Sequence, residues 1–250
     1  MSEPRPLGRV ALHGGGEFLK GDERFLGKLL ETVRGDLGRG TPDTPIRVSI
    51  LPVAAARSRP SAAVAVGRAA FERVAKVAGI ALMITAAMVV DAASAADTAM
   101  ASGVASSDLI YLPGGDPDLV GGVLAGSPVW DAIRAAFEVG AVVAGASAGA
   151  MGLANRTWTR FGFRDGLGFT DGFVVVPHFA GFDRRGWEGT VEELRRNSLG
   201  QLGIDERTGV ISSRGGVGPW VVAGDGAVHW FPAAGAPASA RDGERLDLGA

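Results

Sequence analysis

Residues 141–150, AVVAGASAGA, join a buried strand to a sharp turn and the start of a helix, and this stretch decides the class of fold. Residues 141–144 are all apolar, as in a parallel strand that is buried on both faces of its sheet. The Gly145-x-Ser147-x-Gly149 pattern that follows is typical of a nucleophile elbow, a tight strand-to-helix turn that exposes a serine hydroxyl and accepts only small neighbours. We therefore predict a strand at 141–144, a helix at 148–153 and a nucleophile at Ser147.

On both sides of this stretch, short apolar runs alternate with amphipathic segments. The expected strands are 9–13, 46–53, 81–85, 108–112, 173–176, 210–212, 220–223 and 228–231, and the expected helices are 22–36, 61–77, 92–105, 118–124, 129–139 and 191–199. Such alternation predicts an α/β fold, a doubly wound and mostly parallel sheet with helices on both faces. We expect a single domain over 1–250, with its core at about 9–231 and a polar C-terminal tail at 233–250.

Composition excludes several classes of protein. The chain has 250 residues, a formal net charge of −2 and no cysteine, so it offers neither a disulfide framework, a thiolate metal site nor a cysteine nucleophile. Without a basic field, we expect no nucleic-acid partner. The longest uncharged apolar run, at 77–90, is shorter than the roughly 20 residues of a membrane helix, and no signal peptide is evident. We expect a cytoplasmic protein without a membrane partner.

In an open parallel sheet, ligands bind beyond the carboxyl ends of the strands. The segments that follow predicted strands and would meet at this edge are 13–17, 113–116, 145–150 and 177–179. A serine nucleophile requires a base within hydrogen-bonding reach. His178 ends a strand at this edge and is the preferred candidate, while His13 and His229 are the alternatives.

A base in such a site is oriented by an acid, and the oxyanion of the reaction needs backbone donors. Asp205 and Glu206, in a turn just before a predicted strand, are candidates for the acid, and Asp165 is another. The N–H of Ala148 at the start of the elbow helix would supply one donor. The Gly114–Gly115 turn would supply a second.

The order of these motifs resembles peptidase family S51, which includes aspartyl dipeptidase (peptidase E) and cyanophycinase. The resemblance covers roughly residues 10–231 and rests on the motifs GGD at 114–116, GASAGA at 145–150, GLGF at 166–169, PHF at 177–179 and GIDE at 203–206. It implies the class I glutamine amidotransferase-like fold, a flavodoxin-like three-layer arrangement in which serine replaces the cysteine of the amidotransferases.

The resemblance also implies a serine hydrolase with defined roles. Ser147 would be the nucleophile, His178 the base and Glu206 the acid, with the oxyanion held by the N–H groups of Gly115 and Ala148. The implied reaction is hydrolysis of a small peptide at an aspartyl or β-aspartyl bond through an acyl-enzyme, without metal or cofactor.

Several positions depart from the family pattern or add to it. Relatives often carry Gln or Asn where this chain has Asp116, whose carboxylate would favour an amine or guanidinium in the substrate. Some relatives carry Glu near the position of Asn155, which leaves the identity of the acid open. Arg184 and Arg185 would bind a substrate carboxylate. Glu17 would hold a substrate amino group.

Two other functions remain open at this stage. His13-Gly14-Gly15-Gly16 with the serine elbow is similar to an α/β-hydrolase esterase, in which Ser147, Asp205 and His229 would follow the required chain order. Against it, that motif follows the third strand in those enzymes and the first predicted strand here. The second alternative is a non-catalytic small-molecule-binding protein on the same scaffold, since a fold does not imply activity. A homodimer is compatible with the sequence.

Overall fold

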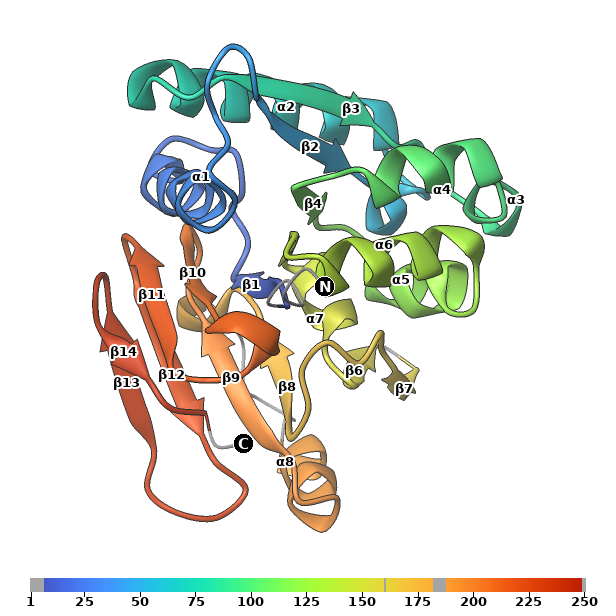
Figure 1. Ribbon diagram of the computed structural model, residues 1–250. Coiled ribbons are helices and arrows are strands. Elements are labelled where there is room, and N and C mark those ends of the chain that lie inside the picture. The colour runs from blue at the N-terminus through green and yellow to red at the C-terminus, as the bar shows by residue number, and fades with distance from the viewer. Residues whose placement is uncertain (1–6, 160, 182–187, 249–250) are drawn as a thin grey trace, which may run out of the picture.

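A computed structural model describes residues 7–159, 161–181 and 188–248, and its main feature is an eight-stranded sheet (Figure 1). Five strands run parallel in the order β1-β5-β4-β2-β3, and three more are antiparallel in the order β14-β11-β10 beside β1. The bounds are β1 Arg9–His13, β2 Ile46–Ile50, β3 Leu82–Ala86, β4 Leu109–Leu112, β5 Val142–Ala146, β10 Thr208–Ile211, β11 Trp220–Gly224 and β14 Arg245–Leu246.

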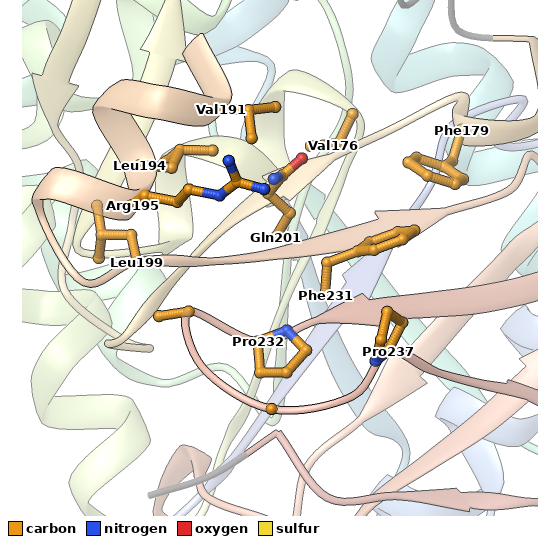
Figure 2. Close-up of a pocket in the computed structure, with 12 residues that line it drawn as sticks. Val176, Phe179, Val191, Leu194, Arg195, Leu199, Gln201, Phe231, Pro232 and Pro237 are labelled. Carbon is orange, nitrogen blue, oxygen red and sulfur yellow. The ribbon is translucent and has the colours of Figure 1, made fainter. Parts of the chain in front are cut away.

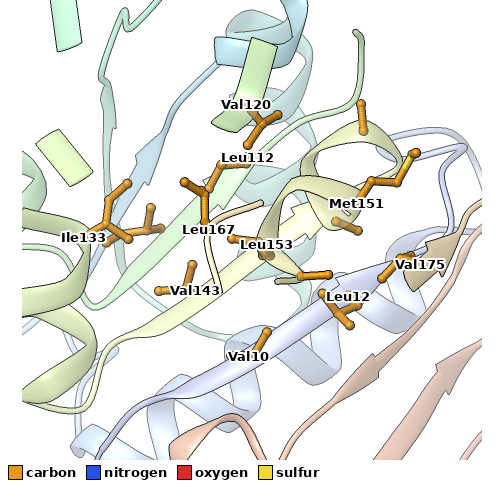
Figure 3. Close-up of a cluster of buried hydrophobic side chains, with 14 of the residues drawn as sticks. Val10, Leu12, Leu112, Val120, Ile133, Val143, Met151, Leu153, Leu167 and Val175 are labelled. Carbon is orange, nitrogen blue, oxygen red and sulfur yellow. The ribbon is translucent and has the colours of Figure 1, made fainter. Parts of the chain in front are cut away.

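Helices cover both faces of this sheet. On one face lie α1 Glu23–Leu37 and α2 Pro60–Ala78. On the other lie α3 Ala92–Ala95, α4 Thr98–Ala105, α5 Pro117–Leu124, α6 Pro128–Glu138 and α7 Ala148–Leu153. Alternate residues of each strand point to opposite faces. Ala11 of β1 accordingly faces α1 and α2, whereas Val10 and Leu12 face the other core, where they are grouped with Val143, Met151 and Leu153 (Figure 3).

A second sheet is formed by the C-terminal part of the chain. Its order is β13-β12-β9-β8, with β8 Phe173–Val176, β9 Gly200–Ile204, β12 Ala227–Phe231 and β13 Ala238–Arg241. Helix α8 Glu188–Arg196 packs against one face of it through Leu194. The remaining elements are the hairpin β6 Arg156–Thr159 and β7 Gly162–Asp165 and the short 3₁₀ turns η1 Val53–Ala55, η2 Phe179–Gly181 and η3 Arg214–Gly216.

The three-layer α/β prediction is confirmed, with three corrections. The helix expected at 92–105 is divided, because the Asp97 side chain caps α4 by accepting from the N–H groups of Ala99 and Met100. The strands β6, β7 and β9 were not predicted. The polar tail expected at 233–250 carries β13 and β14 and buries Leu246 and Leu248, so the core extends past residue 231. None of the described helices is long and apolar enough to cross a membrane.

Candidate active site

Ser147 lies in the turn between β5 and α7, with φ 48° and ψ −115°, a backbone conformation that non-glycine residues rarely adopt. The flanking glycines permit this turn because there is no space for a side chain. A Cβ on Gly149 would lie 2.1 Å from the carbonyl oxygen of Leu112, and one on Gly145 would lie 2.5 Å from the carbonyl carbon of Gly149. The turn is anchored to β1, since the Ser147 N–H donates to the carbonyl of His13 at 2.9 Å.

Ser147, His178 and Glu206 form a continuous chain of contacts. The Ser147 Oγ lies 3.0 Å from His178 Nε2, and His178 Nδ1 lies 2.8 Å from Glu206 Oε1. With Nδ1–H donated to the carboxylate, Nε2 is left to accept the serine proton. The side chains of His178 and Glu206 are 44% and 51% exposed, so the arrangement opens to solvent and to a ligand.

His178 follows β8, a strand of the second sheet, and is held against the first sheet by the loop after β1. The His178 N–H donates to the carbonyl of Gly14 at 2.7 Å. A Cβ on Gly15 would lie 2.2 Å from His178 Cε1, so only glycine leaves room for the imidazole. The Arg207 N–H donates to the carbonyl of Gly15 at 2.8 Å, which brings Glu206, in the turn between β9 and β10, against the same loop. The Gly14–Gly15 backbone therefore positions both His178 and Glu206 near Ser147.

A buried pair, His13 and Asp22, supports this loop from below. His13 Nε2 lies 2.9 Å from Asp22 Oδ1, and both side chains are fully buried. His13 Nδ1 accepts from the N–H of Gly15, and Asp22 Oδ2 accepts from the N–H of Phe18. His13 Nδ1 is thus hydrogen-bonded within the loop, and Nε2 faces Asp22 and not Ser147. Asp22 was missed in the sequence, where it reads only as the start of a helix.

The loop after β4 lies beside Ser147 and carries the predicted second backbone donor. The N–H of Gly114 donates to Glu17 Oε1 at 2.8 Å, whereas the N–H of Gly115 has no acceptor among the described residues. Ala148 is the first residue of α7, where the N–H has no acceptor within the helix. Within the described part of the chain, Gly115 and Ala148 therefore offer two backbone N–H donors without an acceptor.

The other acids considered from the sequence have different partners. Asp205 Oδ2 accepts from the N–H of Ala227, and its Oδ1 lies 3.5 Å from Nε2 of His229. Asp165 pairs with Arg156 at the surface. Asp205 and His229 do approach each other, as an esterase would require, but the hydroxyl of Ser147 contacts His178 and not His229.

The remaining sequence candidates fall outside this chain of contacts. Asp116 Oδ2 contacts Arg57 at 2.7 Å, while its Oδ1 accepts from the N–H of Asp118, so both oxygens already have partners. Asn155 donates to Asp171 at 2.9 Å, and this hydrogen bond is the main reason that the pKa of Asp171 lies below its usual range. Arg184 and Arg185 lie outside the described residues.

A cavity of about 390 Å³ lies next to the His178 loop, between α8 and the second sheet (Figure 2). Val176 and Phe179, which flank the Pro177–His178 step, both line it, together with the largely apolar side chains Val191, Leu194, Leu199 and Phe231. Sequence reasoning did not find this cavity, because its walls come from segments distant in the chain. No group of three or more His, Asp or Glu side chains suited to a metal ion occurs within the described part of the chain.

Two solved structures are similar to this chain. The structure is similar to the crystal structure of a peptidase from an acI-B1 Actinobacterium, with a TM-score of 0.78 and 25% identity over 98% of both chains. It shares its fold with a protein assigned as peptidase E from Listeria monocytogenes EGD-e, with a TM-score of 0.56, 14% identity, and coverage of 88% of this chain and 100% of that one. No curated protein sequence matches the chain.

A match to the sequence model of a peptidase family places this chain among the peptidases. Residues 47–214 match the sequence model of Peptidase family S51, and the chain belongs to that family.

Proposed function

We propose that this peptidase is a serine hydrolase that cleaves a small peptide at an aspartyl or β-aspartyl bond through an acyl-enzyme. The observation that carries the proposal is the chain of contacts from Ser147 Oγ to His178 Nε2 at 3.0 Å and from His178 Nδ1 to Glu206 Oε1 at 2.8 Å. The aspartyl preference is supported by the resemblance to the aspartyl dipeptidases and cyanophycinases of the family.

In the first half of the reaction, His178 takes the hydroxyl proton as Ser147 Oγ attacks the scissile carbonyl carbon. The N–H groups of Gly115 and Ala148 stabilise the oxyanion, and Glu206 stabilises the imidazolium that forms. His178 then gives the proton to the leaving amine, and the C–N bond breaks to leave the acyl-enzyme.

In the second half, His178 removes a proton from water, and the hydroxide attacks the ester carbonyl carbon of the acyl-enzyme. Collapse of the second tetrahedral intermediate breaks the bond between the acyl carbon and Ser147 Oγ, and the proton returns from His178 to the serine oxygen. Acid, peptide amine and free enzyme result, so the balance needs only water.

The test is hydrolysis of α-Asp-X and β-Asp-X dipeptides, with X as Leu, Lys or Arg, and of a short acyl ester. Wild type, Ser147→Ala and the matched control Ser102→Ala, at an exposed position of α4, are followed by mass spectrometry. We expect wild type and the control to cleave an aspartyl peptide and Ser147→Ala to lose at least about 10³-fold in rate.

A second readout is covalent labelling of the wild type with a fluorophosphonate, which should modify Ser147. Cleavage that survives in Ser147→Ala would contradict the proposal. Turnover of the ester alone would favour an esterase. The absence of both turnover and labelling would favour a binding protein.

A further inference from the structure

Three consecutive backbone carbonyl groups, those of residues 13–15 at the end of β1, each accept from a different part of the candidate active site. In chain order, their donors are the N–H groups of Ser147 at 2.9 Å, His178 at 2.7 Å and Arg207 at 2.8 Å. Arg207 directly follows Glu206, so the third carbonyl positions the acid. Movement of this short segment would therefore displace the nucleophile, the base and the acid relative to one another.

This segment has no side chains of its own that could fix its conformation after His13, because residues 14–16 are all glycine. Gly15 has a φ of 100°, and glycine leaves many other conformations accessible. The His13 side chain supplies a constraint, since its Nδ1 accepts from the N–H of Gly15 at 3.2 Å. Its Nε2 lies 2.9 Å from Oδ1 of Asp22, the residue before α1, so the imidazole connects the two ends of the loop.

The surroundings of the imidazole select one tautomer. Nδ1 must be unprotonated to accept from the N–H of Gly15. A carboxylate oxygen 2.9 Å from Nε2 requires a proton on Nε2, because two acceptors at that distance would repel each other. Both side chains are fully buried, so bulk water does not compete for either position. Asp22 therefore favours the form of His13 that is able to hold Gly15.

We propose that Asp22 and His13 are positioning residues for the peptidase reaction, because they fix the segment that aligns its three catalytic groups. This assignment rests on the proposed function and adds to it two residues that act through the backbone and do not touch the reacting atoms. A displacement of about 1 Å between reacting groups costs about 10²-fold in rate. The pair should therefore affect kcat and leave KM nearly unchanged.

The first test compares Asp22→Asn with the wild type in hydrolysis of the aspartyl peptide that the wild type cleaves fastest. Asparagine has the shape of aspartate and keeps an oxygen for the N–H of Phe18, which Asp22 Oδ2 now accepts. Its NH₂ group would then face Nε2, and the imidazole proton would oppose a donor there or, on Nδ1, the N–H of Gly15. We expect kcat to fall by about 10²-fold and KM to stay within about 3-fold.

Asp108→Asn is the matched control, because Asp108 is equally a buried carboxylate but precedes β4, at the edge of the sheet opposite Ser147. We expect this control to lower the stability of the protein and to leave kcat within about 2-fold. An equal loss of kcat in both variants would overturn the assignment, as would an unchanged kcat in Asp22→Asn.

A second pair of variants separates the two nitrogens of His13 and decides the question if Asp22→Asn does not fold. His13→Asn places an oxygen where Nδ1 lies, whereas His13→Gln places an NH₂ group where Nε2 lies. Both remove the ring that packs on Phe25 at a centroid distance of 4.6 Å, so they lose similar packing. We expect kcat of His13→Asn to exceed that of His13→Gln by at least about 10-fold. Equal values, as loss of packing alone would give, or the reverse order would contradict the assignment.

Two spectroscopic measurements do not depend on activity. Nitrogen-15 NMR of the three histidines should show His13 with its proton on Nε2 in the wild type and a changed signal in Asp22→Asn. Hydrogen exchange at the N–H groups of Ser147, His178 and Arg207 should become faster together in Asp22→Asn and not in Asp108→Asn. If these results hold but the wild type turns over no peptide, the proposed chemistry fails and the structural role of the pair stands. If peptides are cleaved and Asp22→Asn keeps its kcat, only the positioning assignment fails.

Discussion

Replacing Ser147 by glycine should stabilise the protein relative to replacing it by alanine, which is the reverse of the usual order. Both substitutions remove the Oγ contact with His178, so the contribution of that contact cancels in the comparison. The two variants differ in the conformational energy of the backbone, because φ 48° and ψ −115° are unfavourable for any residue with a Cβ. Such conformations cost about 1–3 kcal/mol, while glycine loses about 0.5–1 kcal/mol more conformational entropy than alanine on folding.

The net expectation is that Ser147→Gly exceeds Ser147→Ala by about 0–2.5 kcal/mol, with a central value of about 1 kcal/mol, in free energy of unfolding, measured by urea titration. For a chain of this length, each kcal/mol corresponds to about 2–4 °C in Tm. The pair Ser102→Gly and Ser102→Ala, in helix α4, serves as the control, where glycine should be less stable by about 1 kcal/mol. If the glycine variant at position 147 is also the less stable one, the serine turn is not strained and the reasoning is wrong.

Three further predictions follow from individual contacts. Glu206→Gln should lower kcat/KM by about 10²–10⁴-fold, whereas Asp165→Asn, at the surface, should stay within about 2-fold in the same peptide assay. Tyr111 is the only tyrosine in the sequence, and burial raises its pKa. The absorbance of tyrosinate should therefore be absent from the folded protein above a pH of about 10 and should appear with alkaline unfolding. Ionisation near the ordinary pKa of tyrosine would contradict the burial of Tyr111. The hydrogen bond from Asn155 lowers the pKa of Asp171 in the folded protein. The stabilisation that this hydrogen bond gives is therefore present above the pKa of Asp171 in the unfolded chain and is lost as pH falls through its pKa in the folded protein. Asn155→Ala should raise the pKa of Asp171 in an NMR titration, and an unchanged pKa would refute the contact.

Local patterns in the sequence sufficed for the parts of the site that one segment builds. The apolar run before Gly145 and the small residues around Ser147 specify a strand, a turn and a helix without help from the rest of the chain, and the helix at 148–153 has the predicted bounds. His178 was the preferred base because a strand ends just before it. β8 indeed ends at Val176.

The choice between Asp205 and Glu206 could not be made from the residues themselves, because the two are adjacent and chemically alike. Their directions are set by distant partners. Asp205 is drawn to the N–H of Ala227 on β12, whereas the Arg207 N–H binds the carbonyl of Gly15 and brings Glu206 to the imidazole. The family resemblance pointed to Glu206, but the contact itself depends on how two sheets meet.

The sequence by itself determined the alternation of strands and helices, the three-layer class and the serine turn, since each depends on hydrophobic periodicity or on small residues within one segment. Only the tertiary structure decided that β8 belongs to a second sheet and that the segment after residue 231 adds strands to both sheets. It also decided that Glu17 reaches the N–H of Gly114. These features are pairings between residues far apart in the chain. They depend on which backbone and side-chain groups remain unpaired when the layers pack. A local sequence pattern cannot predict which groups those are.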